Sequence, residues 1–229
     1  MDLTKDGILL IDKPEGWTSF DVVAKIRGMR RAGFKTRGIT PTKRQLRVGH
    51  AGTLDPFATG LLVILLGDAT KRSDEFLKQD KTYEATVVLG ASSTTGDPEG
   101  EITAVSDDVP TAEAVDTVLK GFVGIVTQTP PAYSAIKVNG QRAYKLARKG
   151  HAVEIPTRQV TIHSLEIVRY DYPELTVRTH VSSGTYIRSL AEDIGEALGT
   201  GAYCGQLRRT VIGDLSVDDA IDVLKLNID

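Results

Sequence analysis

The chain has 229 residues, of which 41% are hydrophobic and 25% charged, an ordinary composition for a globular enzyme with a buried core. Its longest apolar run, 61–66, is far shorter than the roughly 20 residues that cross a bilayer. The single cysteine, Cys204, excludes an intrachain disulfide, and the four histidines are scattered without the spacing of a zinc site. We therefore expect a cytoplasmic protein that needs neither a metal nor a membrane.

Positive charge is concentrated in one segment, although the net charge is only −2. Nine basic residues and no acidic residue lie between Lys25 and Arg47. The other 19 basic residues stand against 30 acidic ones, which leaves a charge of −11 on the rest of the chain. Such a segment favours contact with a polyanion, because each neutralised phosphate releases counterions. A solvated charged loop is an equally good interpretation of this run alone.

In chain order, residues 7–12 predict a short buried strand and residues 13–16 a turn. A helix should follow, with Ser19 as its cap and Phe20, Val23 and Ile26 buried. Residues 32–48 lack an apolar period and predict an exposed basic loop. The unbroken apolar run at 61–66 predicts a strand covered on both faces, and an alternating strand follows at 83–89.

The second half of the chain mixes both kinds of element. Residues 111–119 predict a helix capped by Thr111, whereas two prolines exclude regular helix from 126–134. Strands are expected at 160–170 and 175–182, and helices at 144–148, 186–198 and 217–226. Because no regular βαβ repeat and no linker is present, we expect one α+β domain over 1–229.

Asp55 is the most informative single residue. It lies between turn-forming glycines, directly before Pro56 and just ahead of the apolar strand. The proline biases Asp55 toward extended backbone, and Leu54, Phe57 and Leu61 would shield the carboxylate from water. Desolvation of that kind perturbs an acid and is frequent at functional sites. A turn aspartate bonded to its own backbone is the plainer alternative.

At this segment the chain resembles the TruB-type tRNA pseudouridine synthases. Further motifs agree in the order of the family, so the resemblance covers nearly the whole chain. They lie at 12–19, 49–62, 81–85, 95–100, 130–148, 182–190 and 207–210. The resemblance implies the pseudouridine synthase fold, with a mixed, mostly antiparallel central sheet. It also implies isomerisation of uridine to pseudouridine at position 55, in the T-loop of tRNA, without a cofactor.

The resemblance also implies roles for individual residues. Asp55 is the catalytic aspartate, acting either on the ribose C1′ or on a C2′ proton, and Arg188 is its ion-pair partner. Tyr83 packs on the flipped base, and His50 occupies the space that the base leaves. Further substrate contacts are expected from the uracil pocket (Tyr186, Leu207), the active-site loop (Lys13) and the RNA-gripping thumb at 127–150 (Lys137, Arg142, Lys145, Arg148).

Two features depart from the family pattern. Larger members carry a C-terminal PUA domain that this chain is expected to lack. The loop 32–48, which carries much of the basic segment, is longer than expected. We therefore expect that segment to contribute phosphate contacts to a monomeric enzyme. The alternatives are a guide-dependent pseudouridine synthase and a non-catalytic protein that binds or folds tRNA. A glycosidase is disfavoured, because no second carboxylate is evident beside Asp55.

Overall fold

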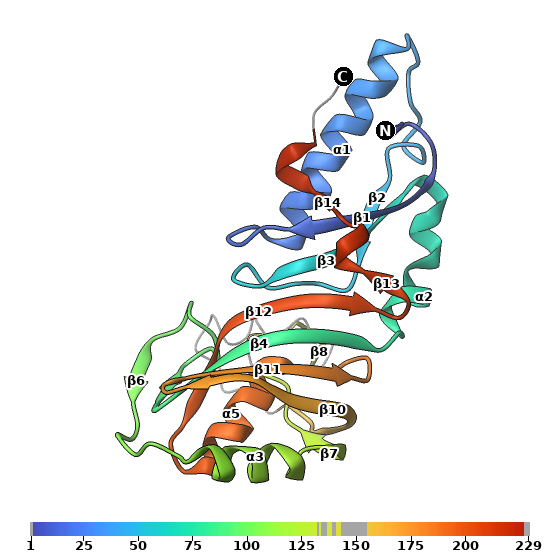
Figure 1. Cartoon of the computed structure of the whole chain (residues 1–229). Helices are drawn as coiled ribbons and strands as arrows, with labels where there is room; N and C mark the ends of the chain where they lie inside the picture. The colour runs from blue at the N-terminus through green and yellow to red at the C-terminus, as the bar shows by residue number, and fades with distance from the viewer. Residues whose placement is uncertain (1, 132, 134–136, 139–140, 143–154, 227–229) are drawn as a thin grey trace. The chain divides into compact units, whose positions relative to one another are not determined.

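A computed structural model describes residues 2–131, 133, 137–138, 141–142 and 155–226. It divides into two compact units. The first contains Met1–Tyr83 and Arg208–Asp229, and the second contains Glu84–Leu207. Two long strands, β4 (Lys81–Leu89) and β12 (Ala202–Ile212), carry the chain from one unit to the other. Helices and a mixed, mostly antiparallel arrangement of strands confirm the expected α+β class (Figure 1).

The sheet of the first unit has the order β14-β1-β3-β12. β1 (Gly7–Lys13) and β3 (Thr59–Leu66) are antiparallel, whereas β14 (Ile221–Asp222) joins β1 and β12 joins β3 in parallel. β2 (Val48–Ala51) also pairs with β3, and β13 (Leu215–Ser216) with β12. Short helical turns η1 (Gly67–Arg72) and α2 (Ser73–Leu77) follow β3.

Strand β3 is covered on both faces, as its unbroken apolar sequence predicts. Leu62, Ile64 and Leu66 pack in one core cluster with residues of α1 (Ser19–Thr36). The intervening Leu61, Val63 and Leu65 pack in a second cluster on the opposite face. This buried strand begins four residues after Asp55 and anchors the loop that carries it.

Three details of the first unit differ from the sequence prediction. Thr18, not Ser19, caps α1, because Thr18 and Asp21 form a reciprocal capping box. That sets the phase of the helix so that Phe20 is 62% exposed and Val22 is buried. The helix also continues to Thr36 because Phe34 is buried under the Arg30 guanidinium, so only the later part of 32–48 is a loop.

The acidic helix predicted at 217–226 is also wrong. The segment forms η2 (Val217–Asp219), β14 and η3 (Val223–Lys225) instead. The Ser216 and Asp222 side chains accept bonds from the backbone at Asp218 and Leu224, which favours short turns over a continuous helix.

The sheet of the second unit has the order β12-β4-β11-β10-β7, with β7 (Gly124–Gln128), β10 (Arg158–Asp171) and β11 (Glu174–Val181) all antiparallel. Helices α3 (Ala112–Gly121) and α5 (Ile187–Leu198) contact each other beside these strands (Figure 1). Thr111 caps α3 as predicted. Two small ribbons complete the unit: β5 (Ala91–Ser93) with β6 (Ile102–Ala104), and β8 (Lys137–Val138) with β9 (Gln141–Arg142).

Candidate active site

Asp55 lies in the loop that joins β2 to β3, and its neighbours along the chain are held by hydrogen bonds. The buried Ser19 hydroxyl accepts from the Leu54 N–H (2.8 Å) and donates to the Leu54 carbonyl (3.1 Å). On the other side, the Pro56 carbonyl accepts from the Gly16 N–H at 2.9 Å. The backbone that carries the half-buried Asp55 carboxylate is therefore fixed from both directions.

Lys13 fixes the same loop from the end of β1. Its side chain is fully buried, and its Nζ donates to the carbonyls of Trp17 (2.6 Å), Pro14 (2.9 Å) and Pro56 (3.3 Å). Burial lowers the pKa of Lys13 from 10.5 to about 8, and the nearby Asp55 carboxylate opposes that shift. Of the three bonds, the one to Pro56 joins Lys13 to the Asp55 loop, and the role of Lys13 toward the substrate stays a prediction.

Arg209 supports the loop from β12 and was not singled out as a site residue. Its buried guanidinium donates from Nη2 to the Gly52 carbonyl (2.9 Å) and from Nε to the Leu61 carbonyl (2.8 Å). These two acceptors bracket the segment that contains Asp55. The motif at 207–210 marked the region, but a side chain directed at two distant carbonyls leaves no signal in the sequence.

His50 and Tyr83, the other two predicted site residues of the first unit, lie on its strands. His50 is half-buried on β2, and its Nδ1 has no hydrogen-bond partner among the residues that the structure describes. Burial and then the Arg209 charge hold the pKa of His50 below its usual 6.5, so the ring is neutral at pH 7. Tyr83 is buried near the start of β4.

In the second unit, Arg188 makes a buried ion pair that the sequence did not predict. Its Nη1 lies 2.8 Å from Asp97 Oδ2, and the two side chains are 5% and 3% exposed. The guanidinium also donates to the carbonyls of Thr95 and Tyr133, each at 2.9 Å. Asp97 Oδ1 in turn accepts from the Thr95 hydroxyl at 2.6 Å. The first turn of α5 is thereby tied to the loop after β5.

The remaining predicted site residues of the second unit differ in how far the structure describes them. Tyr186 is half-buried directly before α5, and Leu207 is buried on β12. Lys137 and Arg142 are directly opposite each other in the β8–β9 ribbon of the expected thumb. Lys145 and Arg148, like the helix expected at 144–148, lie outside the described residues. Because Asp55 and Arg188 belong to different units, their pairing stays a prediction.

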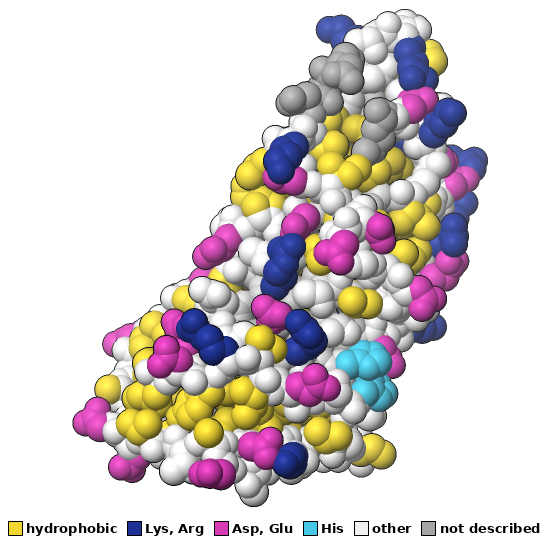
Figure 2. Space-filling model, viewed as in Figure 1, with side chains coloured by type: hydrophobic (Ala, Val, Ile, Leu, Met, Phe, Trp, Pro, Cys, Tyr) yellow, Lys and Arg dark blue, Asp and Glu magenta, His cyan; other side chains and the backbone are white. Residues whose placement is uncertain are grey.

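The basic segment is less available to an outside anion than its sequence indicates. Arg30 is fully buried, lies 2.7 Å from Asp6 and also donates to main-chain carbonyls. Arg37 forms an ion pair with Asp2 at 3.0 Å, and Arg44 pairs with Asp68. On the face of the first unit shown in Figure 2, basic and acidic side chains are accordingly interspersed. The exposed Lys35 and Lys43 fit the expected phosphate contacts better.

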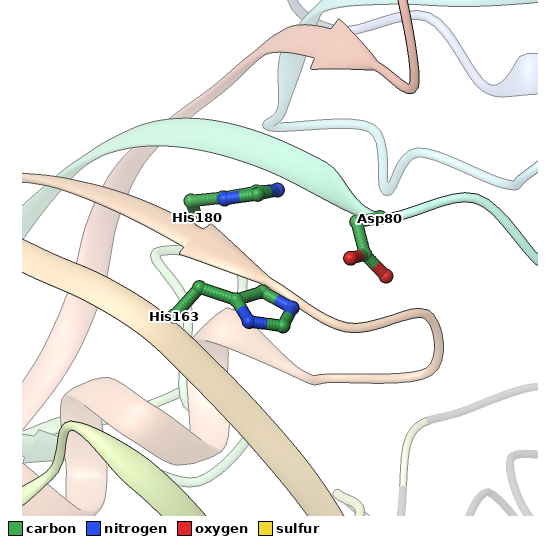
Figure 3. Close-up of side chains that lie close together, drawn as sticks. All are labelled: Asp80, His163 and His180. Carbon is green, nitrogen blue, oxygen red and sulfur yellow. The ribbon is translucent and has the colours of Figure 1, made fainter.

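Strand pairing brings together two of the histidines that are scattered in the sequence. His163 on β10 and His180 on β11 have ring centroids 4.7 Å apart (Figure 3). Ile162 pairs with the antiparallel Val181, and because side chains alternate along a strand, the adjacent His163 and His180 both face the opposite, exposed side. Asp80, also drawn there, belongs to the first unit.

None of the helices in the described part of the chain combines the length and apolar character that crossing a bilayer requires.

The comparisons with known proteins agree with this arrangement. The model of the TruB family pseudouridylate synthase N-terminal domain matches residues 37–187, and that of the tRNA pseudouridylate synthase B C-terminal domain matches residues 188–227. The chain is 47% identical over 219 residues to a tRNA pseudouridine synthase B of Parabacteroides distasonis, covering 95% of this chain and 90% of that protein. A protein of the same name from Bacteroides thetaiotaomicron is 46% identical over 229 residues, covering 97% and 92%.

A solved structure confirms the fold. The chain matches one chain of a Cbf5-Nop10-Gar1 complex with a TM-score of 0.71 and 30% identity, over 99% of its own length and 54% of that chain. It therefore spans about half of that longer protein. The two family models together cover most of this sequence, and the two bacterial relatives match it nearly end to end. This chain belongs to the TruB family of pseudouridylate synthases.

Proposed function

We propose that this chain isomerises uridine to pseudouridine in the T-loop of tRNA, at position 55, with Asp55 as the catalytic carboxylate. The observation that carries the proposal is the Asp55 loop, held by the buried polar side chains of Lys13, Ser19 and Arg209 in a chain of this family. Three buried polar groups that hold one loop favour a functional carboxylate over an ordinary turn, because catalysis needs a fixed reacting group. The protein would act as a monomer in the cytoplasm.

The reaction requires one bond exchange and no redox partner. The bond from ribose C1′ to uracil N1 breaks, the base turns, and a bond from C1′ to C5 forms. The C5 proton is lost, and N1 gains a proton. A single carboxylate serves this sequence either as a nucleophile at C1′ or as a base at C2′, and both routes need it ionised.

The base must leave its stack before its sugar can be reached. A neutral, half-buried His50 suits the space that the base vacates, since it brings no charge into the stacked bases. Tyr83, Tyr186 and Leu207 would contact the flipped uracil. Arg188, already oriented by Asp97, would hold the Asp55 carboxylate in its charged form. Phosphate contacts would come from the thumb and from the exposed lysines of the basic segment.

Tritium release from tRNA that carries [5-³H]uridine tests the reaction and its residue together. The wild-type chain, without guide RNA, should release one equivalent of tritium for each uridine isomerised. Asp55→Asn should release none while it still binds tRNA, because the amide preserves shape but not charge. Release by Asp55→Asn at the wild-type rate would refute the assignment. Binding without any wild-type release would instead favour a tRNA-folding protein, and release only with guide RNA a guide-dependent enzyme.

A further inference from the structure

Two neighbouring strands of the second unit direct side chains at one residue, Tyr186. Gln128 is the last residue of β7, Arg158 is the first residue of β10, and the two are directly opposite each other in the sheet. Gln128 is 1% exposed. Its side-chain amide donates to the Tyr186 carbonyl (2.9 Å) and accepts from the Tyr186 N–H (2.7 Å). Both main-chain polar groups of Tyr186 are thus bonded to one buried amide.

Arg158 holds the ring of the same residue. The guanidinium carbon lies 4.8 Å from the Tyr186 ring centroid, within the range of a cation–π contact. On another side it approaches Gly184, where a Cβ would lie 3.5 Å from the guanidinium carbon. The Nε and Nη2 atoms of Arg158 are buried and have no acceptor within the described ranges. Among the described residues, the main contact of the Arg158 guanidinium is therefore stacking on the Tyr186 ring rather than hydrogen bonding.

The residue held in this way begins the helix that carries Arg188. Tyr186 is the N-cap of α5 but makes no side-chain capping bond, so its position depends on outside contacts. The Ser189 hydroxyl adds a bond to the Thr129 carbonyl, directly after β7. The end of β7 thus contacts α5 at its cap and in its first turn. Gln128 therefore fixes the main chain of Tyr186 and, through it, the start of the helix.

We propose that Gln128 and Arg158 are positioning residues for the isomerisation, and we call them the Tyr186 clamp. Gln128 fixes the main chain of Tyr186 and Arg158 fixes its ring, in the orientation that meets the target uracil. A ring that is already held in place loses little conformational entropy when the base binds. The free energy of its contact with the base is then not offset by ordering of the ring and can increase the rate. This inference rests on the proposed function, because the contact of Tyr186 with the base is part of that proposal.

Single-turnover kinetics with saturating tRNA test the clamp through Gln128→Leu, Arg158→Met and Arg158→Lys. The first two variants should isomerise roughly 5- to 30-fold more slowly, as removal of a cation–π interaction or a hydrogen-bond pair implies, with tRNA affinity within about twofold of wild type. Arg158→Lys should fall between, since a lysine keeps the charge but not the flat stacking group. The matched controls are Gln159→Leu and Arg169→Met, exposed residues of β10 that should leave the rate unchanged.

A double-mutant cycle separates positioning from general destabilisation. If Arg158 acts through the ring, Arg158→Met should slow a Tyr186→Leu enzyme by less than twofold, because the ring is already absent. Full additivity of the two rate reductions would overturn the proposal for Arg158.

A readout without turnover keeps the clamp testable if the enzyme proves inactive. In protein labelled with 3-fluorotyrosine, the ¹⁹F resonance of Tyr186 is identified by its disappearance in Tyr186→Phe. Gln128→Leu and Arg158→Met should shift and broaden that resonance while the other tyrosine signals stay in place. An unchanged Tyr186 resonance would refute the clamp itself. An absence of wild-type isomerisation, with the resonance shifted as expected, would refute the proposed function and the catalytic benefit but confirm the contacts.

Discussion

The Asp97–Arg188 pair should contribute to both stability and activity, and Asp97→Asn tests this with little change in shape. Removing one member of a buried ion pair costs about 3–5 kcal/mol, because the remaining charge stays buried without its partner. In Asp97→Asn, Arg188 would keep its bonds to the Thr95 and Tyr133 carbonyls, and the amide oxygen could still accept from Glu99 N–H. We therefore expect the lower end of that range, about 3 kcal/mol.

Urea and thermal unfolding measure this cost. For a chain of this size each kcal/mol corresponds to roughly 2–4 °C, so the melting temperature should fall by roughly 6–12 °C. The matched control is Glu174→Gln, which removes the carboxylate of the exposed Arg169–Glu174 pair at a similar distance, 2.9 Å, and should have an effect close to zero. If Asp97→Asn costs no more than Glu174→Gln, the buried pair does not stabilise the fold. An unchanged single-turnover rate would show that Asp97 does not orient Arg188 for catalysis.

Three further predictions follow from the first unit. The pKa of Lys13 is about 8 in the folded state against 10.5 in the unfolded state, so between these pH values the unfolded chain binds more protons. The unfolding free energy of wild type, measured relative to Lys13→Met, should therefore rise as the pH increases from 8 to 10.5. A difference that does not change with pH would contradict the effect of burial. Gly60→Ala should lower the free energy of unfolding, measured by urea titration, by at least about 3 kcal/mol. Its Cβ would lie 2.3 Å from the Arg209 carbonyl oxygen, and the backbone φ is +100°. The control is Gly28→Ala in α1, whose Cβ would meet nothing within 4 Å and which should be neutral or stabilising. Neutralising four exposed basic residues together should weaken tRNA binding. The slope of log binding constant against log salt concentration should fall by up to about one unit for each phosphate that is no longer neutralised. An unchanged slope would exclude the segment from the interface. Those four residues are Lys35, Arg37, Lys43 and Arg44.

The sequence predicted the elements whose pattern is local. An unbroken apolar run at 61–66 indicated a strand covered on both faces, and β3 confirms it. The Thr111 cap and the alternating pattern of 83–89 were also confirmed. Where two local signals competed the prediction failed: Thr18 and Ser19 are both good caps, but only Thr18 is followed by an acidic residue at the third position.

Apart from Lys13, which the resemblance places at the active-site loop, the supports of the site could not be predicted, because they act over long sequence separations. Asp97 is 91 residues from Arg188, and its segment reads as a polar turn. Gln128 is 58 residues from Tyr186, and nothing in its local pattern indicates a side chain bonded to a distant main chain. Ser19 reads as a helix cap, whereas its hydroxyl bonds Leu54 instead. The family motifs predict which residues meet the substrate, whereas the fold shows which other residues hold those side chains and their loops in place.

A site-resolved measurement on unmodified tRNA tests directly whether Asp55 catalyses isomerisation in the T-loop. The RNA is incubated with the wild-type chain or with Asp55→Asn, and pseudouridine is then located by carbodiimide labelling and primer extension. We predict one new stop at uridine 55 of the T-loop with wild type and none with Asp55→Asn. A stop at another position would contradict the proposed target, and the same stop with both proteins would contradict the catalytic role of Asp55.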